Sequence, residues 1–282
     1  MGCVRAIHRS LVTGLVSLML IKKERVLNKS VSGELLRCYA VPVLFVLLAL
    51  AILFLHGNKS MFLLFNGLAA HTGDGLWANW TVLGDGWVAL ALLLPFVGRH
   101  PALVWSAIVA AIIAGIAVPL LKNIFLFPRP PAVIAMDVIH IIGPAYKSHS
   151  FPSGHTTTAF VLAGVLSLYF RSYWVFALSL IVAIGVGISR MAVGVHWPLD
   201  VTVGAALGWI CAIVGSSLST RWRWGESLTG QRVIVSLLLL TVLWLLFFYN
   251  QYAPWAALLP KVVAILVLIV GMPGLLRVWR GY

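Results

Sequence analysis

Eight apolar runs constrain the fold of this chain more than any other feature. They lie near residues 39–56, 84–98, 102–121, 155–170, 173–189, 200–218, 232–248 and 260–275. Most are close to the length at which an α-helix crosses about 30 Å of hydrocarbon. Several are short, so we expect the run at 84–98 to recruit residues before Gly84. The pattern predicts an all-α fold, a polytopic bundle of transmembrane helices.

The composition agrees with an integral membrane protein. Of the 282 residues, 61% are hydrophobic and 10% are charged, whereas a soluble domain carries about 25% charged residues. We expect a cytoplasmic or interfacial segment at 1–38, a membrane core of about six helices at 39–218, and a C-terminal transmembrane hairpin at 219–282. The hairpin carries no charge within its crossings and is expected to serve as a scaffold or as the wall of a groove for lipid chains.

The distribution of positive charge predicts the orientation of the chain. The formal net charge of +13 would suggest nucleic acid as a partner of a soluble protein. In this chain, 14 of the 20 Lys and Arg residues fall in segments on the side of the two termini. These are Arg5, Arg9, Lys22, Lys23, Arg25, Lys29, Arg37, Arg99, Arg171, Arg221, Arg223, Arg232, Arg277 and Arg280. We therefore expect cytoplasmic termini, the lipid bilayer as the surroundings and no nucleic-acid partner.

Three polar segments fall on the opposite side. In "LKNIFLFPRPPA", Lys122 ends a crossing, and the prolines that follow it stop the helix and present Arg129. In "SFPSGHTTTAF", Ser153 is a helix N-cap, followed by Gly154 and His155. A helix N-terminus with free N–H groups can bind an anion.

The third segment, "SRMAVGVHWPLD", contains Arg190, His196 and Asp200. Each polar residue has an ordinary explanation: the cations could anchor helix ends at headgroups, His196 could be an interface histidine, and Asp200 could be a first-turn acid. Their coincidence favours a site. Cations beside a helix N-terminus form a phosphate cradle, and an aspartate four residues after a histidine can hold the imidazole in one tautomer.

Together the three segments resemble the signature of the type 2 phosphatidic acid phosphatase family, which includes bacterial membrane lipid phosphatases such as undecaprenyl-diphosphatases and phosphatidylglycerophosphatases. The matching residues are Lys122, Arg129, Pro130, Pro152, Ser153, Gly154, His155, Ser189, Arg190, Gly194, His196 and Asp200. The strict match covers residues 122–200, and the order of the crossings extends it to roughly 40–218.

The resemblance implies a role for each residue. His196 would attack phosphorus and form a phosphohistidine, Asp200 would orient His196, and His155 would protonate the leaving oxygen and then activate water. The phosphate oxygens would be bound by Lys122, Arg129, Ser153, Gly154 and Arg190.

We expect neither a metal nor another cofactor, because the fixed cations would supply the electrostatic stabilisation. A metal clamp would need clustered carboxylates, and the outer face offers only Asp74, Asp85, Asp137 and Asp200.

The expected activity is therefore hydrolysis of a lipid phosphate or diphosphate at the extracytoplasmic face of a bacterial plasma (inner) membrane. Undecaprenyl diphosphate is the first choice, followed by phosphatidylglycerophosphate and phosphatidic acid. A lipid phosphotransferase or a lipid A 1-phosphatase with the same site is the alternative. A transporter is disfavoured, because the crossings lack charges and broken inverted repeats.

The segment 72–87, "TGDGLWANWTVLGDGW", leaves two interpretations open. It could be a membrane-lying lid or substrate entrance, or it could provide tight turns and interfacial aromatic residues.

Overall fold

The computed structural model describes residues 38–252 and 254–281, so the predicted N-terminal segment lies outside the described residues except for Cys38. The chain divides after Val41, and Pro42–Tyr282 form one compact unit. The described residues form helices and no strands, which confirms the all-α class. The main helices are Cys38–Phe54, α2 (Asn58–Thr72), α3 (Asp74–Val82), α4 (Gly86–Ala91), α5 (Pro101–Phe125), α6 (Pro130–Val133), α7 (Gly154–Phe170), α8 (Tyr173–Ala192), α9 (Pro198–Arg221), α10 (Leu228–Phe247) and α11 (Leu259–Arg280).

The helices have the lengths and apolarity of a multi-pass membrane protein. Within the described residues, five spans are long and apolar enough to cross a bilayer, and up to seven if each of two bent pairs crosses as one. α7 is apolar but has only 17 residues. Each predicted apolar run thus corresponds to a helix or to part of a bent pair.

The region between the first two runs departs from the sequence prediction. α2 follows the helix Cys38–Phe54 at a bend of 110°, and the sequence analysis assigned no helix there. The run at 84–98 does recruit earlier residues, but α3 and the helical stretch after Asp85 are bent by 55°. Asp85 explains the break, since its side chain accepts from Trp87 N at 2.8 Å and caps α4. Segment 72–87 therefore contains a helix and a capped turn.

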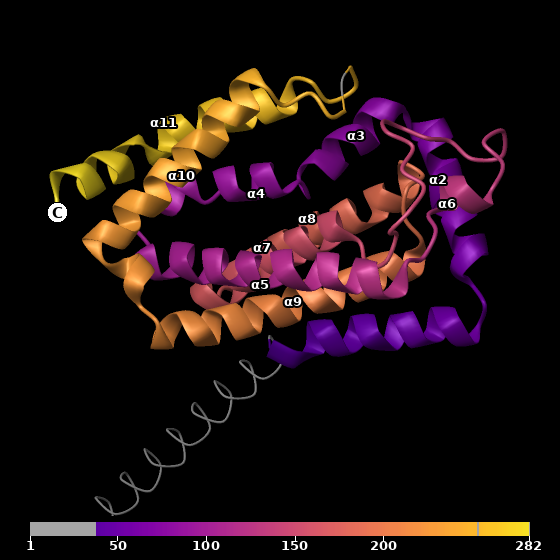
Figure 1. The fold of residues 1–282 in the computed structure, drawn as a ribbon, viewed down its shortest axis with the longest axis horizontal. Helices are drawn as coiled ribbons and strands as arrows, with labels where there is room; N and C mark the ends of the chain where they lie inside the picture. Colours follow the sequence, from indigo (N-terminus) through magenta and orange to yellow (C-terminus); the bar gives the residue numbers. More distant parts are fainter. Residues whose placement is uncertain (1–37, 253, 282) are drawn as a thin grey trace, which may run out of the picture. The chain divides into compact units, whose positions relative to one another are not determined.

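Packing places α7 at the centre of the site-bearing helices. α7 packs against α5, α8 and α9, whereas α10 and α11 pack against each other and against α4 (Figure 1). Gly204 of α9 permits a close approach at the site end of the two helices, because a Cβ there would lie only 2.8 Å from Ser153 O. This approach lets Ser153 N donate to Asp200 O at 3.0 Å, which joins the start of α7 to the start of α9.

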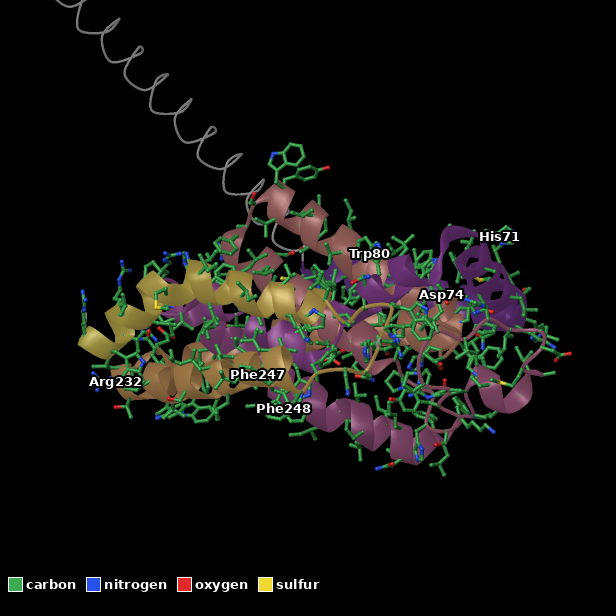
Figure 2. The ribbon with its side chains drawn as sticks, turned by 90° about the horizontal axis from the view of Figure 1, so that it is seen from above. His71, Asp74, Trp80, Arg232, Phe247 and Phe248 are labelled. Carbon is green, nitrogen blue, oxygen red and sulfur yellow. The ribbon has the colours of Figure 1, made fainter. Side chains whose placement is uncertain are left out.

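The two ends of the helices differ in character. Figure 2 shows Arg232 at one end of α10 and Phe247 and Phe248 at the other. Near Arg232, basic side chains bind helix ends: Arg232 Nε donates to Val278 O at 3.4 Å, and Arg277 Nη1 donates to Gly98 O at 3.3 Å. At the opposite end, α5 and α8 finish where α7 and α9 begin.

Candidate active site

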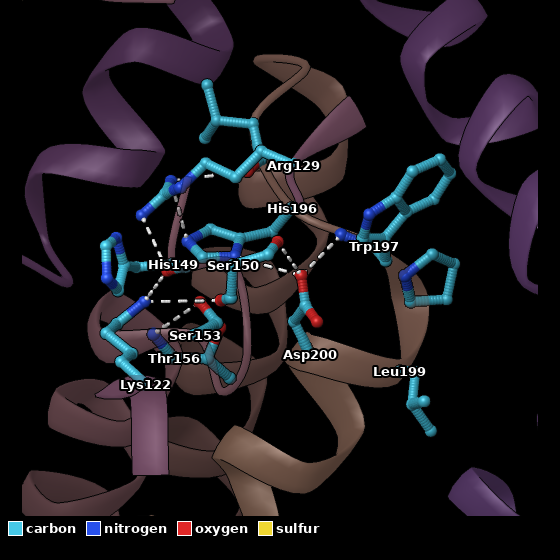
Figure 3. A network of polar contacts seen from close by, with 12 residues as sticks. Lys122, Arg129, His149, Ser150, Ser153, Thr156, His196, Trp197, Leu199 and Asp200 are labelled. Atoms are coloured by element: carbon cyan, nitrogen blue, oxygen red, sulfur yellow. Dashed lines mark hydrogen bonds and ion pairs between the residues drawn. The ribbon is translucent and has the colours of Figure 1, made fainter. Parts of the chain in front are cut away.

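The three polar segments meet where α5 and α8 end and α7 and α9 begin (Figure 3). Backbone hydrogen bonds hold them together: Ser150 N donates to Phe127 O at 2.8 Å, and Arg129 N donates to Lys147 O at 3.0 Å. All of the predicted site residues lie at this end of the helices. They are Lys122, Arg129, Ser153, Gly154, His155, Arg190, His196 and Asp200.

His196 is held between a cation and a carboxylate. Its Nε2 lies 3.2 Å from Nη1 of Arg129, and its Nδ1 lies 3.2 Å from Oδ2 of Asp200. A guanidinium can only donate, so Nε2 must accept and the ring proton must sit on Nδ1, where it donates to Asp200. The 2%-exposed imidazole therefore directs an unprotonated nitrogen toward the cations.

Asp200 is itself fixed by two further donors on the same oxygen. Ser150 Oγ donates to Asp200 Oδ2 at 2.5 Å, and Trp197 N donates to it at 2.9 Å (Figure 3). Ser150, which is fully buried, was not among the site residues predicted from the sequence. No local pattern separates it from the neighbouring Ser148, and only the fold brings its hydroxyl to the carboxylate.

The electrostatic surroundings keep His196 neutral. Burial, followed by the charges of Arg129 and Arg190, holds the pKa of His196 well below its ordinary value of 6.5. A neutral imidazole with the proton on Nδ1 keeps Nε2 unprotonated, and its lone pair can attack an electrophile once Arg129 turns from it to a bound anion.

Lys122 and Arg129 hold the loop that precedes α7. Lys122 Nζ donates to the carbonyl oxygens of His149 and, at 3.2 Å, Ser150. Arg129 Nε donates to Ser148 O at 2.9 Å, and the guanidinium lies 5.2 Å from the ring centroid of Tyr146. Both cations point into the loop, which argues against a role as simple headgroup anchors.

The start of α7 has the predicted cap. Ser153 Oγ accepts from Thr156 N at 3.4 Å and from Thr156 Oγ1 at 2.9 Å, and the helix begins at Gly154. N–H groups in the first turn have no acceptor within the helix. The backbone at Gly154 can therefore donate to an anion in front of α7.

Arg190 and His155 form the other wall of the site. Arg190 is 2% exposed, which excludes an anchor at the membrane surface. Its Nη1 donates to Thr81 Oγ1 and, at 2.8 Å, to the hydroxyl of Tyr252. Within the described part of the chain, buried Nε of Arg190 and buried Nε2 of His155 have no hydrogen-bond partner. Thr81 and Tyr252 come from distant segments and were not predicted from the sequence.

An apolar cavity of about 340 Å³ begins at the start of α7 and runs between α4, α5 and α7. Glycine and alanine line much of it, and its polar side chains are the two threonines of α7. The lining includes Gly86, Ala89, Ala107, Ala111, Gly115, Gly154, Thr157 and Thr158. An apolar chain attached to a group at Gly154 can occupy this space.

Other ionisable residues take structural positions. His140 Nε2 lies 2.7 Å from Oδ1 of Asp74, which ties the loop after α6 to the start of α3. Among the described residues, no group of three or more His, Cys, Asp or Glu side chains could hold a metal ion.

Comparisons with known proteins match the part of the chain that carries the site. The family model described as the PAP2 superfamily matches residues 103–224. The undecaprenyl-diphosphatase of Sulfolobus acidocaldarius is 31% identical over 157 residues, which cover 54% of this chain and 74% of that protein. The lipid A 1-phosphatase of Porphyromonas gingivalis is 40% identical over 74 residues, or 26% of this chain and 17% of that protein.

A solved structure shares the fold. The crystal structure of Aquifex aeolicus LpxE superposes with a TM-score of 0.51 at 33% identity, covering 57% of this chain and 94% of that one. The family-model match at 103–224 runs from α5 to the end of α9, the helices that carry the site.

Proposed function

The chain belongs to the PAP2 superfamily and is a phosphoric ester hydrolase, and we propose that it removes phosphate from a membrane lipid, without a metal, through a phosphohistidine. The observation that carries this proposal is the fixed tautomer of His196, with Nε2 unprotonated and directed at Arg129. The hydrogen bond to Nε2 comes from Arg129 and not from a hydroxyl that His196 could activate as a base, which favours direct attack on phosphorus.

The proposed reaction has two steps. His196 Nε2 attacks phosphorus, and the N–P bond forms as the P–O bond to the leaving group breaks. His155, protonated in the substrate complex where the phosphate anion offsets the charge of the nearby cations, gives its proton to the departing oxygen. His155 then takes a proton from water, the water oxygen attacks phosphorus, and the N–P bond breaks to release inorganic phosphate. Asp200 stabilises the positive charge that His196 acquires.

The cations and the start of α7 bind the phosphate oxygens in this proposal. Lys122, Arg129 and Arg190 supply charge, and the Ser153 hydroxyl and the Gly154 N–H supply neutral donors. Such fixed groups stabilise the charge of a phosphoryl transition state as a magnesium ion does in other enzymes. Activity should therefore persist in excess EDTA, and vanadate should inhibit as a mimic of the transition state. Loss of activity on chelation that magnesium restores would contradict this account.

Undecaprenyl diphosphate is the proposed substrate. The Sulfolobus relative supports this choice by its name, and the apolar cavity that begins at Gly154 supports a single long chain next to the phosphate. The Porphyromonas relative favours lipid A 1-phosphate as a second candidate. A phosphotransferase would pass the phosphoryl group from His196 to a lipid hydroxyl and release no free phosphate.

A panel of purified lipid phosphates tests the substrate. Free phosphate would be measured with undecaprenyl diphosphate, phosphatidylglycerophosphate, phosphatidic acid and lipid A, using His196→Ala as the blank. The proposal expects the highest kcat/KM for undecaprenyl diphosphate. A higher value for lipid A would select the second candidate, and phosphorylated lipid without free phosphate would indicate transfer.

We further propose that the site faces the extracytoplasmic side of a bacterial plasma membrane, with both termini in the cytoplasm. Charge asymmetry supports this orientation, since Arg223 and Arg232 lie at the end of the helices opposite the site. A membrane-impermeant maleimide applied to spheroplasts should label Lys147→Cys and spare Arg223→Cys. Labelling of only Arg223→Cys would invert the topology.

A further inference from the structure

We infer that Tyr252, in the segment that joins α10 to α11, is a positioning residue that holds Arg190 and His155 in place for catalysis. This inference rests on the function proposed above. It assigns the C-terminal hairpin a part in the site, whereas the sequence predicted only a scaffold or the wall of a groove.

Tyr252 is buried next to Arg190 and His155. Its side chain is 2% exposed, and its hydroxyl accepts from Arg190 Nη1 at 2.8 Å. Its ring meets that of His155 edge to face, with the centroids 6.4 Å apart at 86°. On the loop side, a Cβ on Gly143 would lie 2.9 Å from the Tyr252 ring, and Gly143 has φ +86°. The loop can approach the ring this closely because residue 143 is glycine.

The chemistry of the Arg190 contacts suits an anion site. Thr81 and Tyr252 hold the guanidinium through hydroxyl oxygens, and no carboxylate of the described residues lies within ion-pair distance of it. A carboxylate would neutralise the cation and compete with a phosphate for it. Two hydroxyls instead fix the direction of Arg190 and preserve its charge, while buried Nε stays without a partner among the described residues.

Tyr252 also lies outside the part of the chain that matches the family model, which ends at residue 224. The hairpin that carries it packs on α4, so the contact with Arg190 connects the hairpin to the part of the chain that matches the family model.

The test compares Tyr252→Phe with Tyr169→Phe in the full-length protein. Tyr169 lies near the end of α7 that is far from the site, and its hydroxyl lies 3.2 Å from Nδ1 of His100. Tyr252→Phe keeps the ring and removes the acceptor, so kcat/KM for phosphate release should fall by about 10- to 100-fold. Tyr169→Phe should stay within about twofold of wild type.

A double-mutant cycle with Arg190→Lys separates positioning from general destabilisation. If Tyr252 acts through Arg190, adding Tyr252→Phe to Arg190→Lys should change kcat/KM by no more than about twofold. Wild-type kinetics in Tyr252→Phe, or its full effect repeated in the Arg190→Lys background, would overturn the inference. Both outcomes leave the proposed function standing as long as His196→Ala remains inactive. Thermal midpoints of all variants should be measured alongside, since a structural defect would lower them in step with activity.

Discussion

The two histidines of the site have opposite surroundings. Both ring nitrogens of His196 are engaged, one by Arg129 and one by Asp200. On the other wall, His155 Nε2 is buried without a partner among the described residues, as is Nε of Arg190. A buried polar atom without a partner costs about 1–3 kcal/mol. The fold thus prearranges the nucleophile and leaves the opposite wall to be completed by a ligand.

The residues that hold His196 and those that hold Arg190 also come from different parts of the chain. Residues that orient His196 come from within the family match at 103–224, namely Arg129, Ser150 and Asp200. Arg190 instead depends on α3 and on the α10–α11 segment, which lie outside that match. The partners of His196 therefore lie within the family match, whereas the partners of Arg190 lie outside it, although His155 and Arg190 themselves lie inside it.

Removal of the nucleophile should have the largest effect. His196→Ala should lower kcat/KM by at least about 10⁴-fold for every phosphate ester, because no phosphohistidine can form. Alkaline quenching with labelled substrate should trap phosphoenzyme in wild type and none in the variant. His71→Ala, a change at an exposed histidine of α2, is the control. Activity of His196→Ala within tenfold of wild type would remove His196 from this role.

His155→Ala should discriminate between substrates where His196→Ala does not. A lipid alkoxide or phosphate leaves poorly without a proton, so turnover of the lipid should fall by about 10²- to 10⁴-fold. p-Nitrophenyl phosphate has a good leaving group. With this substrate, the decrease in the rate of the first step, measured as the burst of nitrophenol, should be much smaller. Equal losses on both substrates would show that His155 does not act as the acid.

Much of this arrangement could be predicted from local sequence. Hydropathy located nearly every long helix, and the cap at Ser153 and the start of α9 at Pro198 follow from rules of helix termini. The three polar segments were expected at one face because alternating crossings bring them there. The hydrogen bonds from Ser150 N to Phe127 O and from Ser153 N to Asp200 O join all three.

The parts that could not be predicted depend on contacts between distant residues. Arg190 looks like a cation at a helix end, but its partners Thr81 and Tyr252 are 109 and 62 residues away in the chain. Ser150 lies 50 residues from Asp200. α2 was missed because it follows a sharp bend, and hydropathy contains no information about the direction of a helix.

A smaller loss of activity is expected when Asp200 loses one of its hydrogen-bond donors. Ser150→Ala removes the Oγ donor to Asp200 and leaves Trp197 N in place, so kcat/KM should fall by about tenfold. Ser167→Ala is the matched control, since Ser167 is a buried serine of α7 that bonds Ala163 O. If Ser150→Ala and Ser167→Ala behave alike, the nucleophile wall does not need this hydrogen bond.

The smallest expected effect is the response of His196 itself to pH. Because burial and the charges of Arg129 and Arg190 disfavour the imidazolium, the lowered pKa keeps His196 neutral as the pH falls through 6.5. Nitrogen NMR of histidine-labelled protein, assigned with His196→Asn, should show a neutral ring protonated on Nδ1 between about pH 8 and 6. Exposed His71 provides an internal reference.

Arg129→Gln tests the cause of the lowered pKa of His196, because it removes the cation that contacts the ring. The titration midpoint of His196 should then rise toward 6.5, whereas Arg99→Gln, at the far end of the helices, should leave it unchanged. The direction of this pKa shift also predicts how the stability of the fold depends on pH. Below pH 6.5 the unfolded chain binds a proton that folded His196 does not, so acidification should weaken the fold, and less so in Arg129→Gln. A midpoint at or above 6.5 in wild type would mean that the nucleophile is not held neutral by its surroundings, and the contrast between the two walls would fail.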